Sequence, residues 1–261
     1  MENIMFDLEK FDLKLNTDVI GRNFIYAEEV PSTNTELLSE NNFYKKNGSV
    51  LFAEKQTEGK GRKNRAWYSD DQMNLTFSIL ITEPKYFQKK VNIINFVASL
   101  ALAVSIENLY QLRTELKWPN DILINDKKVA GILIESTSKG SKIERLVIGI
   151  GLNVNQISFQ RKFTIEPTSL RKELGHTVER EKTLAEILNN IEEILNKSIK
   201  FPDKILEDWK AKCKMIGERI TVVNDDVKKH GIFNDIDKNG FMVLRTDDKM
   251  ETLHFGDVSI L

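Results

Sequence analysis

The stretch that decides the interpretation of this chain reads Lys117-Trp118-Pro119-Asn120-Asp121-Ile122-Leu123-Ile124, then Asn125-Asp126-Lys127, then Lys128-Val129-Ala130-Gly131-Ile132-Leu133-Ile134-Glu135. Two apolar runs flank three residues that suit a tight turn, so the stretch predicts a β-hairpin. The two-residue period of a strand predicts that Lys128 lies on the face of Ala130, Ile132 and Ile134.

The charges at the end of this hairpin indicate a ligand site. Asp121 begins the strand that faces Lys128, and a partly desolvated ammonium needs an anion because an unpaired buried charge is costly. The alternative is a surface hairpin with ordinary solvated charges. Gly131 in mid-strand favours the site, since such a glycine often marks the close approach of a ligand or of another backbone. We therefore expect a pocket for a phosphorylated ligand.

The same stretch resembles the signature of biotin–protein ligases, which adenylate biotin with ATP and transfer it to a lysine of an acceptor domain. The resemblance runs from Ser32 to Leu261, with the motifs in family order. It implies an α/β fold of the α+β type: a mixed, mostly antiparallel sheet with packed helices, followed by a small SH3-like β-barrel. It implies a catalytic biotin- and ATP-binding domain over residues 1–214 and a C-terminal domain over residues 215–261. No winged-helix DNA-binding domain precedes these motifs, as in ligases that do not regulate transcription.

The composition agrees with a globular protein of this kind. The 261 residues suffice for one large domain and a small one, and 38 basic residues nearly balance 39 acidic ones. No global field therefore favours nucleic acid or an anionic membrane. The single cysteine, Cys213, excludes an intramolecular disulfide framework, and the N-terminus lacks the pattern of a secretory signal. We expect a cytoplasmic protein.

A polar run near the N-terminus is the candidate for one end of the site. Thr33 followed three residues later by Glu36 predicts a capping box that opens a helix. Capping alone explains these residues, but the resemblance places Ser32-Thr33-Asn34 in the biotin site. Hydroxyls and free backbone N–H groups at a helix start suit the donors and the acceptor of a ureido ring.

A basic, glycine-containing loop runs from Gly59 to Arg65. Crowded cations repel one another until an anion arrives, so the loop is a candidate phosphate lid, although a solvated turn is the plain alternative. It is not a P-loop, because Gly61 follows Lys60 and the upstream glycine is missing. It resembles the Gly-Arg-Gly-Arg-Arg-Gly-Arg loop of biotin ligases, with Lys60 and Asn64 as departures. Lys60 keeps the charge of an arginine and loses its bidentate geometry.

The remaining pattern predicts the elements around the site. Strands are expected over residues 49–53, 74–81 and 143–150, a buried helix over residues 90–110, and an amphipathic helix opened by a capping box at Thr183 and Glu186. A shorter helix begins at Pro202. Strands over residues 219–223, 230–235, 240–245 and 252–260 then form the barrel, whose Phe255-Gly256-Asp257-Val258-Ser259 resembles the family's C-terminal domain. His176, His230 and His254 show no metal spacing.

The resemblance assigns the site residue by residue. It implies that Lys128 and Arg62 are catalytic and that Asp121, with Asn120 beside it, binds Mg²⁺ through oxygen ligands. The implied biotin contacts are Ser32, Thr33, Asn34, Gln56, Gly59, Lys60, Gly61, Trp67, Lys128, Gly131 and Gly149. The implied ATP contacts are Arg62, Lys63, Arg65, Lys117, Asn120, Lys128 and Asn153; on pattern alone, an asparagine in a turn explains Asn153 equally well.

The predicted reaction joins two anions, the carboxylate of biotin and the α-phosphate of ATP, and passes biotin to a lysine of a biotin carboxyl carrier domain. No nucleic-acid or membrane partner is expected, and a homodimer stays open. A lipoate–protein ligase is the nearest alternative, and it would need a long apolar slot. A non-enzymatic RNA-binding module is the other, since Trp67 and Tyr68 adjoin the cations.

Overall fold

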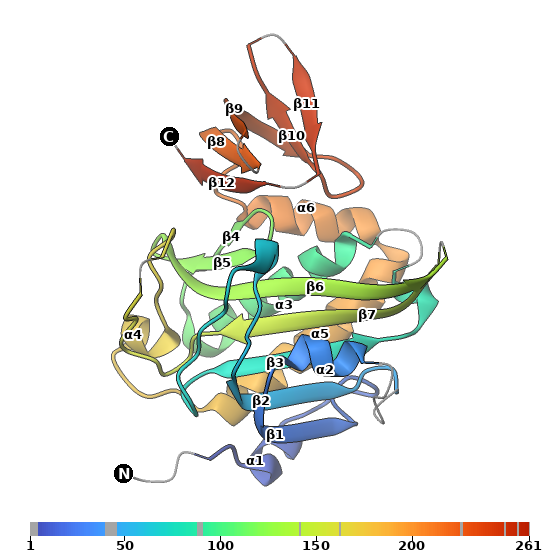
Figure 1. Cartoon of the computed structure of the whole chain (residues 1–261), viewed down its shortest axis with the longest axis vertical. Coiled ribbons are helices and arrows are strands. Elements are labelled where there is room, and N and C mark those ends of the chain that lie inside the picture. The colour runs from blue at the N-terminus through green and yellow to red at the C-terminus, as the bar shows by residue number, and fades with distance from the viewer. Residues whose placement is uncertain are drawn as a thin grey trace.

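A computed structural model describes residues 5–39, 46–87, 91–140, 142–161, 163–224, 227–247, 249–254 and 256–260. Its largest element is a seven-stranded sheet in the order β1-β2-β3-β7-β6-β5-β4 (Figure 1). Among its described strands only β1 and β2 pair in parallel, so the predicted mixed, mostly antiparallel sheet is confirmed. Its strands are β1 (Phe24–Val30), β2 (Val50–Gln56), β3 (Leu75–Ile81), β4 (Glu115–Lys117), β5 (Asp121–Ile124), β6 (Lys127–Lys139) and β7 (Lys142–Leu152).

Helices cover the two faces of this sheet unequally. Three long helices, α3, α5 and α6, pack together behind the sheet, whereas the short α2 crosses the opposite face (Figure 1). The helices are α1 (Leu8–Asp12), α2 (Thr33–Leu38), α3 (Ile93–Tyr110), α4 (Leu170–Leu174), α5 (Arg180–Lys200) and α6 (Pro202–Lys212), with 3₁₀ turns η1 (Arg62–Asn64) and η2 (Pro84–Tyr86). The face of α2 is the face left open for a ligand.

Helix α3 is the buried helix that the sequence predicts, and it begins at Ile93; Lys90 lies outside the described residues. By length and composition it is the one described helix that is apolar enough to cross a membrane. Two thirds of it, however, is buried inside the protein, between the sheet and helices α5 and α6. Its apolar character is therefore that of a core helix.

The central hairpin departs from its prediction in one decisive detail. Ile122 pairs with Ala130, but the next residue of β5, Leu123, pairs with Lys128, so Val129 is an extra residue on β6. Such a β-bulge shifts the alternation of side chains by one. The prediction that Lys128 shares a face with Ala130 is therefore wrong: the Lys128 side chain lies against Gly131 on the opposite, α2-side face, while Val129 and Ala130 are fully buried.

The first strand of the expected hairpin is interrupted. Residues 118–120 turn the chain back on itself, so that β4 and β5 form a small antiparallel pair in place of one strand. This turn contains the cis Trp118–Pro119 bond, and Asn125 and Asp126, both at positive φ, form the turn into β6. The turn at 118–120 carries Asn120 to the mouth of the sheet, directly beside Asp121.

Both predicted capping boxes are wrong in register. Ser32, with an extended backbone, is the N-cap of α2 and accepts a hydrogen bond from the Thr35 amide at 3.5 Å. Helix α5 begins at Arg180, three residues before Thr183, whose hydroxyl donates to the Glu179 carbonyl within the first turn. The buried ion pair of Arg180 with Glu54 of β2 fixes this earlier start.

A second sheet follows the helices and stands at the top of the view in Figure 1. It is antiparallel, in the order β11-β10-β9-β8-β12. Within the described residues its outer strands, β11 and β12, do not pair, so the expected small barrel is an open five-stranded sheet here. The single strand expected over residues 252–260 is divided between two strands, β11 and β12. The strands are β8 (Arg219–Asn224), β9 (Val227–Ile236), β10 (Met242–Arg245), β11 (Met250–Leu253) and β12 (Asp257–Ile260).

Candidate active site

A cleft of about 360 Å³ opens on the α2 side of the main sheet. Its floor is formed by strand residues that share one face of β3, β6 and β7, among them Thr76, Gly131 and Gly151. Residues from the segments 60–68, 159–161 and 163–167 also line it, and Asp257 and Val258 of the second sheet complete one wall. Because strands far apart in sequence supply the floor, the cleft depends on the fold as a whole.

Glycines in the floor let side chains lie directly on the sheet. A Cβ atom at Gly151 would overlap the indole ring of Trp67, and a Cβ atom at Gly149 would overlap the Asn34 amide. Trp67 therefore lies against the strand backbone as a flat apolar wall of the cleft. No hydrogen-bond partner for its buried indole N–H is found among the described residues.

The first end of the cleft is a buried polar network, which we call the α2 end: Ser32, Thr33, Asn34, Gln56 and Ser78. The Gln56 side-chain oxygen accepts hydrogen bonds from the Thr33 amide at 2.7 Å and from its hydroxyl at 3.1 Å. The Ser78 Oγ lies 2.6 Å from both the Thr33 hydroxyl and the Asn34 Oδ1. The groups that face the cleft here are hydroxyl and amide dipoles without formal charge.

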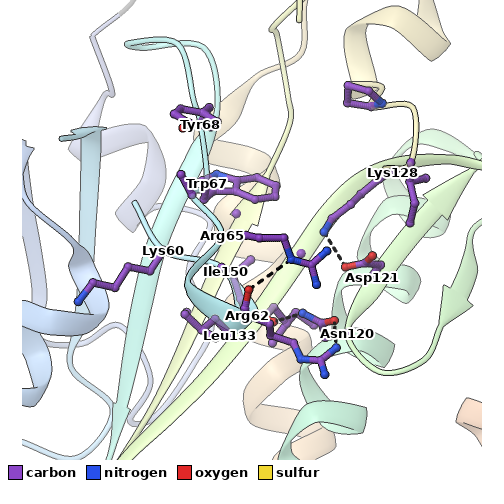
Figure 2. A pocket seen from close by; sticks show the side chains of 18 of the residues that line it. Lys60, Arg62, Arg65, Trp67, Tyr68, Asn120, Asp121, Lys128, Leu133 and Ile150 are labelled. Atoms are coloured by element: carbon purple, nitrogen blue, oxygen red, sulfur yellow. Dashed lines mark hydrogen bonds and ion pairs between the residues drawn. The ribbon is translucent and has the colours of Figure 1, made fainter. Parts of the chain in front are cut away.

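At the centre of the cleft lies an ion pair. The Lys128 Nζ is 2.6 Å from the Asp121 Oδ1, and the side chains are only 26% and 16% exposed. The ammonium also lies 5.7 Å from the centre of the Trp67 ring. Figure 2 shows this pair extending into the space beneath Trp67. A half-buried cation is thus placed between the two ends of the cleft, with one carboxylate as its partner.

The second end, which we call the basic end, consists of Arg62, Arg65, Lys117 and Asp257. Arg65 donates to the Asp257 Oδ1 at 2.6 Å. Arg62 donates to the Asn120 Oδ1 at 3.3 Å and to the Gly256 carbonyl at 3.4 Å. Burial lowers the pKa of Arg62 from its usual value. The segment that enters the second sheet at β12 therefore supplies a carbonyl and a carboxylate partner to cations that line the cleft.

The pKa of Lys117 reflects its burial close to other cations. Its pKa is lowered, first by burial and further by the like charges of Lys128 and Arg65, although Asp121 opposes the shift. A buried amine with a lowered pKa gains most from a ligand that brings negative charge. This end of the cleft therefore suits a phosphate chain.

Asn153 is a cleft-lining residue whose polar side chain suits the edge of a nucleotide base. Asn153 donates to the Thr168 carbonyl at 2.9 Å, which fixes the orientation of its amide. Its buried Oδ1 has no partner among the described residues. An unsatisfied buried acceptor at a cleft wall is matched to an amine donor such as that of adenine.

The comparisons with known proteins agree with this geometry. Residues 26–153 match the biotin/lipoate A/B protein ligase family, and residues 215–261 match the biotin protein ligase C-terminal domain. The bifunctional ligase/repressor BirA of Bacillus spizizenii is 30% identical over 251 residues, which cover 94% of this chain and 76% of that protein. The chain belongs to the biotin protein ligase family.

Further relatives support the membership of this chain in the biotin protein ligase family. The biotin–[acetyl-CoA-carboxylase] ligase of Paracoccus denitrificans is 32% identical over 203 residues, 75% of this chain and 83% of that protein. The biotin protein ligase of Aquifex aeolicus, solved in complex with biotin and ATP, superposes with a TM-score of 0.77 at 30% identity. The match covers 92% of this ligase and 99% of the solved chain.

The structure brings most of the predicted site residues into one cleft. Those that line it are Ser32, Thr33, Asn34, Gln56, Lys60, Gly61, Arg62, Arg65, Trp67, Lys117, Asn120, Asp121, Lys128, Gly131, Gly149 and Asn153. Two do not line it: Gly59 is buried behind Trp67, and Lys63 is exposed. The Lys60 ammonium turns away from the centre (Figure 2) and donates to the Thr35 hydroxyl at 3.0 Å.

Sequence reasoning missed two groups of the ligase. Ser78 lies beneath Thr33 and Asn34, yet in the sequence it is an ordinary polar position within a strand. Asp257 pairs with Arg65 from 192 residues away. Its sequence context indicates only the second sheet, so no local signal joins it to the basic loop.

Proposed function

We propose that this ligase uses the cleft to convert biotin and ATP into biotinyl-5′-AMP and pyrophosphate, and then to biotinylate a lysine of a biotin carboxyl carrier domain. The single observation that carries the proposal is the position of the Lys128–Asp121 pair. It lies between a neutral polar end and a cationic end, where the two reacting anions must meet. The relatives named as biotin–[acetyl-CoA-carboxylase] ligases support this choice of acceptor.

The α2 end fits the ureido ring of biotin. A ureido ring offers two N–H donors and one carbonyl acceptor, and Ser32, Thr33 and Gln56 provide both kinds of complement. Trp67 then covers the fused rings as an apolar wall. A lipoate chain would leave these buried polar groups unpaired, which costs about 1–3 kcal/mol for each group. We therefore place biotin with its ureido ring at the α2 end and its carboxylate toward Lys128.

The first step forms one bond and breaks one. A carboxylate oxygen of biotin attacks the α-phosphorus of ATP, and the bond from that phosphorus to the bridging oxygen of pyrophosphate breaks. Lys128 attracts both the carboxylate and the α-phosphate, so it reduces their repulsion and stabilises the charge that moves onto the pyrophosphate oxygens. The ammonium is released for this role as the negative charge of the substrates replaces part of its pairing with Asp121.

The basic end binds the phosphates of ATP in the first step. In the second step the bound biotinyl-5′-AMP reacts without leaving the cleft. Arg62 and Arg65 exchange their protein partners, Asn120, Gly256 and Asp257, for phosphate oxygens. The lysine amine of the acceptor then attacks the acyl carbon of biotinyl-5′-AMP, AMP leaves, and the amine loses a proton to give the amide. Residues 159–161 and 163–167, which line the cleft, would exclude water that would otherwise hydrolyse the mixed anhydride.

The donors present do not form a resident Mg²⁺ site. No group of three His, Cys, Asp or Glu side chains that could hold a metal occurs in the described part of the chain. The Asp121 Oδ1 is paired with Lys128, and the Asn120 Oδ1 accepts from Arg62. We therefore write Mg²⁺ as part of the MgATP substrate, in keeping with its usual binding through phosphates and one or two carboxylates. Contact of Asp121 with that ion remains a prediction, and no step depends on it.

Several broader predictions accompany this proposal. We keep residues 1–214 as the catalytic unit and residues 215–261 as a unit that contributes Gly256 and Asp257 to the basic end. A cytoplasmic location remains a prediction, which the lone cysteine supports. The balanced charge predicts no nucleic-acid or membrane partner, and the oligomeric state stays open.

A transfer assay tests the proposed function directly. The full chain is incubated with α-labelled ATP, Mg²⁺ and either biotin or lipoate, with and without a biotin carboxyl carrier domain. We expect labelled biotinyl-AMP without acceptor, and biotinylated acceptor only when ATP is present. Transfer of lipoate in place of biotin, or no adenylate with either acid, would contradict the proposal.

A further inference from the structure

We propose that Ser78 is a positioning residue that turns Thr33 into a hydrogen-bond acceptor toward the cleft, so that the ligase selects a ring with an N–H at that point. This inference rests on the proposed function, because it assumes that the ureido ring lies at the α2 end. It concerns the direction of one hydroxyl proton, and it follows from counting donors and acceptors in a buried network.

The first step is the orientation of the Asn34 side chain. Its Nδ2 donates to the Leu133 carbonyl at 3.2 Å and to the Glu135 carboxylate at 2.7 Å. Both of these partners only accept hydrogen bonds. The amide nitrogen must therefore face them, and the oxygen Oδ1 must face Ser78.

The second step is the Ser78 proton. Ser78 is fully buried on β3, and its Oγ lies 2.6 Å from the Asn34 Oδ1, an atom that carries no hydrogen. The hydroxyl of Ser78 must donate its one proton to that oxygen, since a buried carbonyl without a donor is costly. Toward Thr33, also 2.6 Å away, Ser78 therefore offers only a lone pair.

The third step is the Thr33 proton. Among the described residues, the Thr33 hydroxyl lies within hydrogen-bond distance of the Ser78 Oγ at 2.6 Å and the Gln56 Oε1 at 3.1 Å, and both accept. The Gln56 oxygen already accepts from the Thr33 amide at 2.7 Å. Ser78 is the closer partner, so the Thr33 proton points into the protein. What Thr33 presents to the cleft is a lone pair, which a ring N–H can match and a ring oxygen cannot.

Removal of the Ser78 hydroxyl would release this arrangement. In Ser78→Ala, the Thr33 proton keeps only the longer, shared contact with Gln56, and it becomes free to turn toward the cleft. Thr33 would then donate to an acceptor as readily as it accepts from a donor. The variant should thus lose discrimination at the ring, while the chemistry at Lys128, at the centre of the cleft, is unchanged.

The test measures dissociation constants for biotin and for its two cyclic carbamate analogues, each with one ring N–H replaced by oxygen. The full chain is compared with Ser78→Ala, Thr33→Val and the double variant. Ser105→Ala is the matched control, because Ser105 is an equally buried serine that bonds the Ala101 carbonyl within α3.

We expect wild type and Ser105→Ala to bind biotin roughly tenfold or more tightly than one of the carbamates, in line with a buried acceptor left unpaired. Ser78→Ala should reduce that ratio to about threefold or less, and the change should appear in the dissociation constants of the ring ligands and not in the KM for ATP, which binds at the basic end. In the Thr33→Val background, Ser78→Ala should change the ratio no further, because the two act through one hydrogen bond.

Three results would overturn the inference: an unchanged ratio in Ser78→Ala, additive effects in the double variant, or a wild type that does not discriminate either carbamate. If the alanine variant does not fold, Ser78→Cys, which keeps a weak donor, should give a ratio between wild type and the low limit; a wild-type ratio would contradict the proposal. A wild type that binds no biotin would instead contradict the proposed function.

Discussion

The two ends of the cleft are built on different physical principles. At the α2 end, short uncharged side chains on strands and a helix start bind one another at 2.6–3.1 Å. At the basic end, long charged side chains reach partners on another sheet, and Arg65 remains half exposed. The first end is fixed before any ligand binds, whereas the second pairs its cations with the protein's own oxygens. We infer that the α2 end determines which acid is bound and the basic end determines whether the reaction proceeds.

The largest effect should come from the residue between the two ends. Lys128→Ala removes the cation shared by the reacting carboxylate and phosphate, so adenylate formation should slow about a hundredfold or more. Biotin binding at the α2 end should change far less. Single-turnover formation of biotinyl-AMP from α-labelled ATP measures the rate. The matched control is Lys127→Ala, which removes the neighbouring lysine and its pair with Glu166 at 3.3 Å. Adenylate formation at the wild-type rate would exclude Lys128 from the mechanism.

The next effect should be confined to the basic end. Arg62→Gly removes a charge-assisted contact to phosphate and leaves the loop backbone freer. Such a contact contributes about 1.5–3 kcal/mol, so biotinyl-AMP should leave roughly ten- to a hundredfold faster. The released anhydride acylates any amine, and the variant should therefore biotinylate an unrelated lysine-rich protein.

The control for this variant is Arg113→Gly, at an exposed position before β4 that does not line the cleft. It should label the bystander protein no more than wild type does. If Arg62→Gly makes adenylate, retains it as long as wild type and labels no bystander, the retaining role assigned to Arg62 is wrong.

The smallest effect is a pH dependence that only the basic end should show. Burial lowers the pKa of Lys117 below its usual 10.5, and a bound phosphate would raise it again. ATP binding therefore takes up a proton as the pH approaches the lowered pKa, and affinity should fall as the pH rises through that alkaline range, by at most about tenfold per pH unit. Lys117→Arg, which stays charged, should remove this slope.

Calorimetry in two buffers of different ionisation enthalpy measures the proton uptake. Biotin amide, which lacks the carboxylate, serves as the control ligand, because the side chains that we place around its ureido ring do not titrate in this range. An equal slope for biotin amide, or an unchanged slope in Lys117→Arg, would contradict the assignment to Lys117.

The sequence identifies those parts of the ligase whose signal is local. The buried helix α3 and the strands β2, β3 and β7 follow from apolar runs, and Lys128, Gln56 and Trp67 lie in short motifs. Strand β1 has no such signal: only partly buried along its length, it shows no clean alternation and was not predicted. Four C-terminal strands are predicted and five are present, because residues 252–260 divide into parts of β11 and β12.

The failures within the site have one physical origin, which is that tertiary pairing overrides the local pattern. The face of Lys128 depends on how β6 pairs with β5, and a two-residue period read from the sequence does not include the extra residue at Val129. Ser78 acts on Thr33 across 45 residues, and Asp257 acts on Arg65 across 192. Such contacts exist only once the strands are assembled.

The bulge at Val129 also bears on how this hairpin tolerates change during evolution. Loss of that single residue would leave every charged and polar residue of the site in the sequence. Regular pairing of the shortened β6 would place Lys128 directly next to Ala130, so the alternation of side chains would keep Lys128 on the face of Gly131 and the cleft. A one-codon deletion of Val129 should thus be far less damaging than loss of the lysine itself, and its main cost should be the packing of the fully buried Val129 side chain.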